Sequence, residues 1–215
     1  GLPPGEGSGG GYVSKNGTCG VRRADAASPD RLNLLQERKE TSMKLETLQS
    51  IRERRSIRAY RPEQISREEL DTVLEAGTWA PTGMGRQSPK MVAVQDPETI
   101  ALLSRLNARV LGSDTDPFYG APTAVVVFAD PEVPTWLEDG SLVMGTLLLA
   151  AHAAGLGSCW IHRARQVFET AEGKALMKRW GIPDRFVGVG HCILGYAAGE
   201  APQPKPRKAD YIVRD

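Results

Sequence analysis

The spacing of apolar side chains changes character near Met43. Residues 1–42 are rich in Gly, Pro, Ser and charged side chains and show no sustained apolar period. After Met43 the apolar positions recur at the intervals of helices and strands. The pattern predicts a folded domain over residues 43–215, preceded by a flexible N-terminal extension or a cloning remnant over residues 1–42. A tail that orders against a partner is the alternative, because this segment holds a small apolar stripe of Leu32, Leu34 and Leu35.

Helical periodicity recurs along the domain. One helix should begin at Ser66, an N-cap residue that Glu69 completes as a capping box, and should end before Pro81. Another, over residues 139–155, is apolar nearly all round, so we expect it to be buried on every side, in the core or in a subunit interface. The other helices are expected over residues 43–54, 97–111 and about 169–180.

Strands are predicted between these helices. Residues 123–129 form a β-branched run typical of a central strand, and residues 91–94 read as a short buried strand. Helices and strands alternate without regular βαβ units, and neither a dinucleotide-binding nor a P-loop glycine motif occurs. We therefore predict an α+β fold with one sheet covered by helices. Further strands are expected over residues 158–161, 187–196 and 211–213.

Composition removes several classes of function. The 215-residue chain carries a formal net charge of +1, which gives no overall electrostatic attraction to nucleic acid or to an anionic membrane. The longest apolar run, residues 147–154, is broken by His152 and is too short to cross a bilayer. Three cysteines without a C-x-x-C pair predict neither disulfides nor a metal site, so we expect reduced thiols in the cytoplasm.

A basic cluster marks the junction between the first helix and an extended stretch. Guanidinium groups bind phosphate oxygens two at a time, and a serine hydroxyl adds a donor. The cluster is therefore either a phosphate site or a solvated helix end, which the helix dipole also favours. A second basic run, residues 205–208, could fold onto the first, and spacing alone leaves this open. The residues of the first cluster are Arg54, Arg55, Ser56 and Arg58.

Two glycine-containing segments could let a flat ligand approach the backbone closely. The first, residues 80–89, has two prolines and two glycines and is otherwise an ordinary connection between a helix and a strand. The second, residues 155–163, adds an apolar wall of Trp160 and Ile161. Of the histidines, His152 and His191 are expected to be satisfied core residues, and His162 to lie near a substrate.

Taken together, four motifs resemble those of the FMN-dependent nitroreductase family. They are R-R-S-x-R-x-Y, A-P-T-G-x-x-x-Q, G-L-G-S-C-W-I, and V-G-V-G-H-C-I-L-G-Y followed by K-P-R-K. Their order and spacing match the family over residues 43–215. The resemblance implies a nitroreductase-like mixed β-sheet flanked by helices, in an intertwined homodimer that builds two flavin mononucleotide (FMN) sites at its interface.

The resemblance also assigns roles to residues. The phosphate and ribityl chain would be held by Arg54, Arg55, Ser56, Lys205 and Arg207, with Arg58 towards the pyrimidine edge of the flavin. The partner's copies of Pro81, Thr82 and Gly83 would line the ring, in the loop that also holds Gly85 and Gln87. Backbone groups around Ile161, His162 and Arg163 would face flavin N5 and O4. Two departures concern the ring loop: Gly85 stands where many relatives have Asn, and Lys90 where an aromatic residue is common.

The activity that the resemblance implies is hydride transfer from NAD(P)H through flavin N5 to nitroaromatic, quinone or similar acceptors by a ping-pong route. The cofactor would carry the chemistry, so no side chain is predicted to be catalytic in its own right. Arg58 and Lys205 would stabilise the reduced flavin electrostatically. The alternatives are a specialised dehalogenase or dehydrogenase of the same family and, because of Gly85, a non-enzymatic flavin-binding protein.

Overall fold

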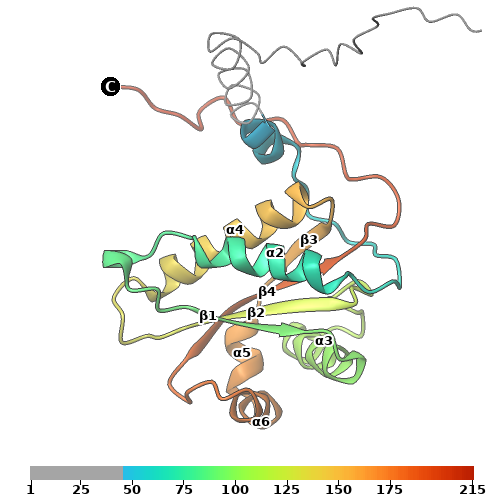
Figure 1. The fold of residues 1–215 in the computed structure, drawn as a ribbon, viewed down its shortest axis with the longest axis vertical. Coiled ribbons are helices and arrows are strands. Elements are labelled where there is room, and N and C mark those ends of the chain that lie inside the picture. Colours follow the sequence, from blue (N-terminus) through green and yellow to red (C-terminus); the bar gives the residue numbers. More distant parts are fainter. Residues whose placement is uncertain (1–45) are drawn as a thin grey trace, which may run out of the picture. The chain divides into compact units, whose positions relative to one another are not determined.

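The structure, a computed structural model, describes residues 46–215 (Figure 1). In this part of the chain four strands form one sheet in the order β1-β2-β4-β3, and all neighbours are antiparallel. An isolated parallel bridge joins Ser56, outside these strands, to Ser158 of β3. The α+β class is confirmed, whereas the expectation for residues 1–42 lies outside the described residues. The strands are β1 (Lys90–Val94), β2 (Thr123–Ala129), β3 (Gly157–Ile161) and β4 (Val187–Gly195).

Helices cover both faces of the sheet (Figure 1). One face packs against α2 (Arg67–Thr78) and α4 (Trp136–Ala153). The other packs against α3 (Pro97–Leu111), α5 (Ala164–Glu169) and α6 (Ala171–Arg179). The central strand β2 is buried along its whole length and alternates between the two cores, with Val125 and Val127 in one core and Val126 and Phe128 in the other.

Local sequence signals set the helix boundaries. The capping box of α2 forms as predicted: Ser66 Oγ accepts a hydrogen bond from Glu69 N–H, and the Glu69 carboxylate accepts one from Ser66 N–H. Asp96 caps α3, whose predicted bounds are confirmed, and left-handed Gly112 ends it. Among residues 46–215, no helix is long and apolar enough to cross a membrane.

The helix predicted over about residues 169–180 is confirmed as α6. The structure adds a short helix directly before it, α5, which the sequence analysis did not predict, and Thr170 separates the two. The Thr170 backbone is extended and its hydroxyl accepts from Gly173 N–H, so this residue caps a new helix. A side chain on Gly173 would collide with the Val167 carbonyl oxygen, so only glycine permits the sharp turn.

Three sequence predictions are corrected by the structure. β1 is an edge strand whose only buried residue is Val94, so it is not the buried strand expected. Residues 211–213 form no strand with any described residue and are largely exposed. Helix α4 begins earlier than predicted, at Trp136, and within one chain it is buried on one side only, with Leu137 and Leu142 about half exposed.

His191 lies in the middle of β4, fully buried between the rings of Phe118 and Phe168. It is a core residue, as expected, but it is not satisfied: neither ring nitrogen makes a hydrogen bond of normal geometry with any of residues 46–215. Burial is the main cause that lowers the pKa of His191 to about 4; the Ile161 backbone raises the pKa, and the charge of Arg163 lowers it by a smaller amount. The ring is therefore neutral at neutral pH.

This burial predicts acid sensitivity of the fold. Below pH 6.5 the unfolded chain protonates His191 while the folded chain does not until about pH 4, so stability falls as the pH falls through this window. We expect His191 alone to lower the free energy of unfolding by about 2 kcal/mol between pH 7.5 and pH 5. Chemical denaturation of the wild type and of His191→Leu at both pH values measures this. An equal pH dependence in the two proteins would contradict it.

Candidate functional site

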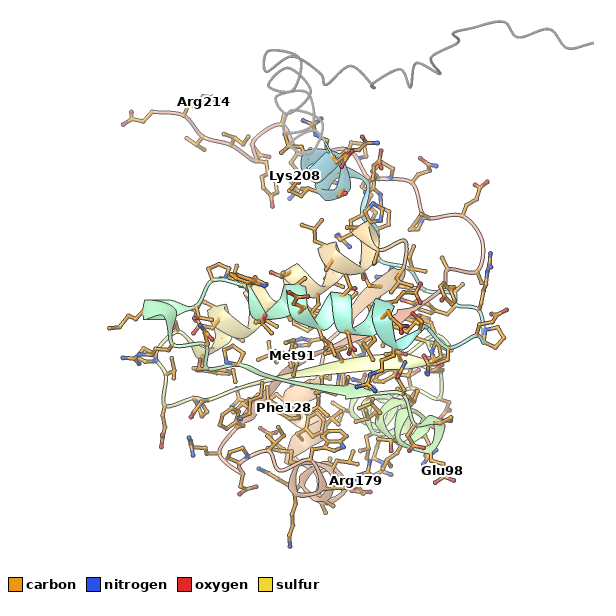
Figure 2. The ribbon with its side chains drawn as sticks, viewed as in Figure 1. Met91, Glu98, Phe128, Arg179, Lys208 and Arg214 are labelled. Atoms are coloured by element: carbon orange, nitrogen blue, oxygen red, sulfur yellow. The ribbon has the colours of Figure 1, made fainter. Side chains whose placement is uncertain are left out.

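An open groove of about 810 Å³ separates the helix of residues 46–53 from the C-terminal tail. The helix side of the groove is lined by residues 51, 52, 54–56 and 58, and the tail side by residues 202–208 and 211. Figure 2 shows Lys208 of the tail beside this helix. The structure therefore brings together the two basic segments that the sequence could not place relative to each other.

The groove is strongly positive. None of the Asp or Glu residues among residues 46–215 lines it, whereas the cationic residues that line it come from both ends of the described chain. An uncompensated cluster of this kind favours a multiply charged anion. Its cationic residues are Arg52, Arg54, Arg55, Arg58, Lys205, Arg207 and Lys208.

Two guanidinium nitrogens in the groove are buried and unpartnered. Arg54 Nη1 and Arg55 Nε have no hydrogen-bond acceptor among residues 46–215. Arg55 Nη1 instead donates to the carbonyl oxygens of Arg52 and Arg54, at 2.6 and 2.8 Å, and so holds the guanidinium at the end of the helix. A buried donor without an acceptor costs roughly 1–3 kcal/mol.

Backbone pairing holds this cluster beside the sheet. Ile57 N–H donates to Ser158 O at 2.9 Å, next to the Ser56–Ser158 bridge. Further along, Arg61 N–H donates to Tyr196 O, also at 2.9 Å. A side chain at Gly157 would press against Ile57, so this glycine permits the close approach. Residues 56–61 thus run along the ends of β3 and β4.

The turn after β3 carries the predicted residues Ile161, His162 and Arg163. Because Ser56 pairs with Ser158, this turn lies roughly 10 Å along the strand from the basic cluster. Ile161 is buried and His162 is exposed. Arg163 has a φ of 73°, a left-handed conformation that is strained for a residue other than glycine.

A buried asparagine on α3 stabilises this turn. Asn107 is fully buried, donates to the carbonyl oxygen of His162 at 2.8 Å and accepts from Arg163 Nε at 3.0 Å. The Arg163 side chain is therefore directed to α3. This side chain is half-buried.

The loop of residues 80–89 is fixed to the start of α4. Gly83 N–H donates to the buried carboxylate of Asp139 at 2.8 Å. Inside the loop, Gln87 N–H donates to Thr82 Oγ1 at 3.0 Å. Gly85 has a φ of 64° and open space around it, which suits the glycine here and also the asparagine of many relatives, because both tolerate this conformation.

The described chain brings only part of the predicted site together. The groove unites Arg54, Arg55, Ser56 and Arg58 with Lys205 and Arg207, and β3 connects it to Ile161, His162 and Arg163. The loop with Pro81, Thr82, Gly83, Gly85 and Gln87 lies elsewhere. In Figure 1 this loop, which carries the short 3-10 helix η1 (Gly83–Gly85), extends at the left beyond α2, far from the helix of residues 46–53.

Sequence reasoning missed the buried polar residues behind both loops. Asn107 and Asp139 lie inside helices, and neither belongs to one of the four motifs. For Asp139 a signal was available, because a carboxylate at the start of an otherwise apolar helix needs donors there. Asn107 lies on the buried face of α3 with Leu103 and Leu106, and for this residue the sequence offers no such signal.

The fold and the groove define an α+β protein with a positively charged groove beside its sheet. The nitroreductase family model matches residues 51–113 and 112–196. The chain therefore belongs to the nitroreductase family, and the resemblance of the four motifs is confirmed.

Named relatives and solved structures agree. A protein of Archaeoglobus fulgidus named NADH dehydrogenase/NAD(P)H nitroreductase is 34% identical over 72% of this chain and 87% of its own length. FMN reductase [NAD(P)H] of Bacillus subtilis is 27% identical over 75% of this chain and 70% of its own length. The crystal structure of a Bacteroides fragilis nitroreductase with bound FMN is similar, with a TM-score of 0.73 and 30% identity, over 79% of this chain and 98% of that chain.

The role of Asn107 yields a stability prediction. Asn107→Leu leaves the His162 carbonyl oxygen without its donor and releases Arg163 from its anchor, so we expect the free energy of unfolding to fall by roughly 2–3 kcal/mol. Arg105→Ala, at an exposed position of the same helix, should change it by less than about 0.5 kcal/mol. Urea denaturation followed by circular dichroism measures both. Equal stabilities of the two variants would contradict the anchoring role.

Proposed function

We propose that this chain is an FMN-dependent oxidoreductase that takes hydride from NAD(P)H and reduces nitroaromatic, quinone or similar acceptors by a ping-pong route. Family membership and FMN-bound solved structures support the cofactor, since the B. fragilis protein and a Desulfitobacterium hafniense nitroreductase, 28% identical with a TM-score of 0.71, both hold FMN. NAD(P)H stands in the names of the A. fulgidus and B. subtilis relatives, which supports it as the electron donor. Bound FMN would supply the redox chemistry itself.

The unpartnered guanidinium nitrogens of Arg54 and Arg55 are the observation on which the proposal rests. They are buried donors in a groove without acidic residues, which is the environment that a phosphate dianion requires. Ser56 is a further hydroxyl donor in the same groove. The residues present therefore fit the phosphate end of FMN.

The remaining roles follow from the layout of the chain. Lys205 and Arg207 on the exposed tail would close the groove over the phosphate and ribityl chain. Backbone groups of Ile161, His162 and Arg163 would lie at the reactive edge, held there by Asn107. The exposed guanidinium of Arg58 would stabilise negative charge that develops on the pyrimidine edge.

We further propose that two copies of the chain assemble into the complete site. The 80–89 loop lies away from the basic groove of its own chain, so it would line the flavin of a partner. The outward face of α4 supports such an interface, because Leu137 and Leu142 are about half exposed on a helix that is apolar nearly all round.

The proposed function is tested by the visible spectrum of the purified protein, recorded anaerobically with FMN before and after NADH or NADPH is added. We expect flavin absorption bands that bleach with at least one nucleotide and return when a quinone or nitroaromatic is supplied. Bands that never bleach would favour a flavin-binding protein without this activity. Slow reoxidation by the whole acceptor panel would favour a specialised dehalogenase or dehydrogenase. Failure to bind FMN would contradict the proposal.

Arg54→Ala tests the phosphate assignment within the same experiment. Loss of a charge-assisted hydrogen bond should weaken FMN binding roughly 10- to 100-fold, measured by fluorescence titration. Arg61→Ala removes an exposed arginine that does not line the groove and is the matched control. We expect it to bind FMN as the wild type does.

The proposed dimer predicts a specific effect of Leu142→Asp. A charge on the exposed face of α4 should dissociate the dimer, and FMN should be lost with it because the partner's loop is removed from the site. Leu111→Asp places the same charge at a similarly exposed leucine on α3, on the opposite face of the sheet, and should remain dimeric. Sedimentation velocity and flavin content measure both. A monomeric wild type that binds FMN fully would contradict the shared site.

A further inference from the structure

Asp139 is a charged side chain that none of the roles above uses. It lies in the first turn of α4 and is only 2% exposed. None of Lys, Arg or His among the described residues forms an ion pair with it. A buried carboxylate is costly unless donors satisfy it, and here the positive end of the helix dipole assists them.

The donors that satisfy Asp139 belong mostly to the 80–89 loop. Gly83 N–H donates to Oδ1 at 2.8 Å, and Ser88 Oγ approaches Oδ2 at 3.5 Å. Thr135 Oγ1, at the start of α4, donates to Oδ2 at 3.0 Å. One carboxylate thus contacts both ends of the loop and the helix that carries it.

The packing around Gly83 makes this attachment tight. A Cβ atom at Gly83 would lie 2.2 Å from Thr135 Oγ1, so the loop backbone lies directly against the threonine. Between these attachment points the loop is strained, with positive φ at Met84 and Gln87, both residues other than glycine. Strained backbone persists only where its surroundings hold it, and Asp139 is the charged group that does so here.

We infer that Asp139 is a positioning residue: it fixes the 80–89 loop to α4 and thereby sets the binding of the electron acceptor. The inference rests on the proposed function, in which this loop lines the flavin and α4 forms the subunit interface. The same carboxylate then connects the interface helix to the wall of the site. Movement of α4 at the interface would be passed directly to the acceptor pocket.

Asp139→Ala and Asp139→Asn separate this role from simple support of the fold. The alanine variant removes both acceptor oxygens. The asparagine variant keeps a carbonyl oxygen for Gly83 N–H, and the Thr135 and Ser88 hydroxyls can rotate to accept from its amide. Glu138→Ala is the matched control, because it removes an exposed carboxylate from the same helical turn that also interacts with the helix dipole.

Two measurements on the flavin-loaded protein decide the matter. Amide hydrogen exchange of the peptide over residues 79–90 should be at least about tenfold faster in Asp139→Ala, with exchange in β2 unchanged. The KM for a quinone acceptor should rise roughly tenfold, with a smaller change in kcat. Asp139→Asn should stay within about threefold of the wild type in both, and Glu138→Ala should match it.

The possible outcomes are distinct. A folded Asp139→Ala protein with wild-type KM, whether or not its loop exchanges faster, would overturn the inference while leaving the proposed function intact. An Asp139→Asn variant as impaired as the alanine variant would also overturn it, because charge rather than loop attachment would then be at work. A wild type that binds no FMN would overturn the proposed function and, with it, the role of Asp139 in acceptor binding.

Discussion

Backbone hydrogen bonds between residues 56–61 and the ends of β3 and β4 determine where everything else in the site lies. They hold the arginine cluster against the sheet. Residues 59–61 pair with residues 196–198, where the tail leaves β4. The tail can then return along the helix of residues 46–53 and complete the groove. Without this pairing the two basic segments would be separate solvated surfaces, and neither would retain a buried guanidinium.

The two loops assigned to the flavin are stabilised in the same way. Each is anchored by one buried polar side chain from a helix: Asn107 of α3 for the turn after β3, and Asp139 of α4 for the 80–89 loop. Both loops contain residues other than glycine at positive φ, and both anchors bind main-chain groups beside those residues. The helices thus hold the loops in a strained backbone conformation. A flat cofactor can be positioned precisely only where the surrounding backbone is held in this way.

The described chain also shows where it is incomplete. Helix α4 is apolar nearly all round but is covered on one side, and the 80–89 loop projects away from the basic groove. Both features have one explanation in a second copy of the chain, whose α4 would cover the exposed leucines and whose groove would receive the loop. In the proposed dimer the interface would be part of the flavin site, so that stability of the dimer and occupancy by the cofactor would be linked.

The sequence determined the elements that depend on local chemistry: the capping box of Ser66 and Glu69, the bounds of α3, the uniformly apolar β2 and the guanidinium cluster all follow from neighbouring residues. Its motifs also indicated the family. The tertiary structure decided what depends on groups distant in the chain. Only the fold shows that the Arg54 cluster faces the tail, that Asn107 and Asp139 anchor loops through contacts across more than fifty residues, and that His191 is buried without hydrogen bonds. Local propensity cannot encode such contacts, because their partners meet only after the sheet has formed.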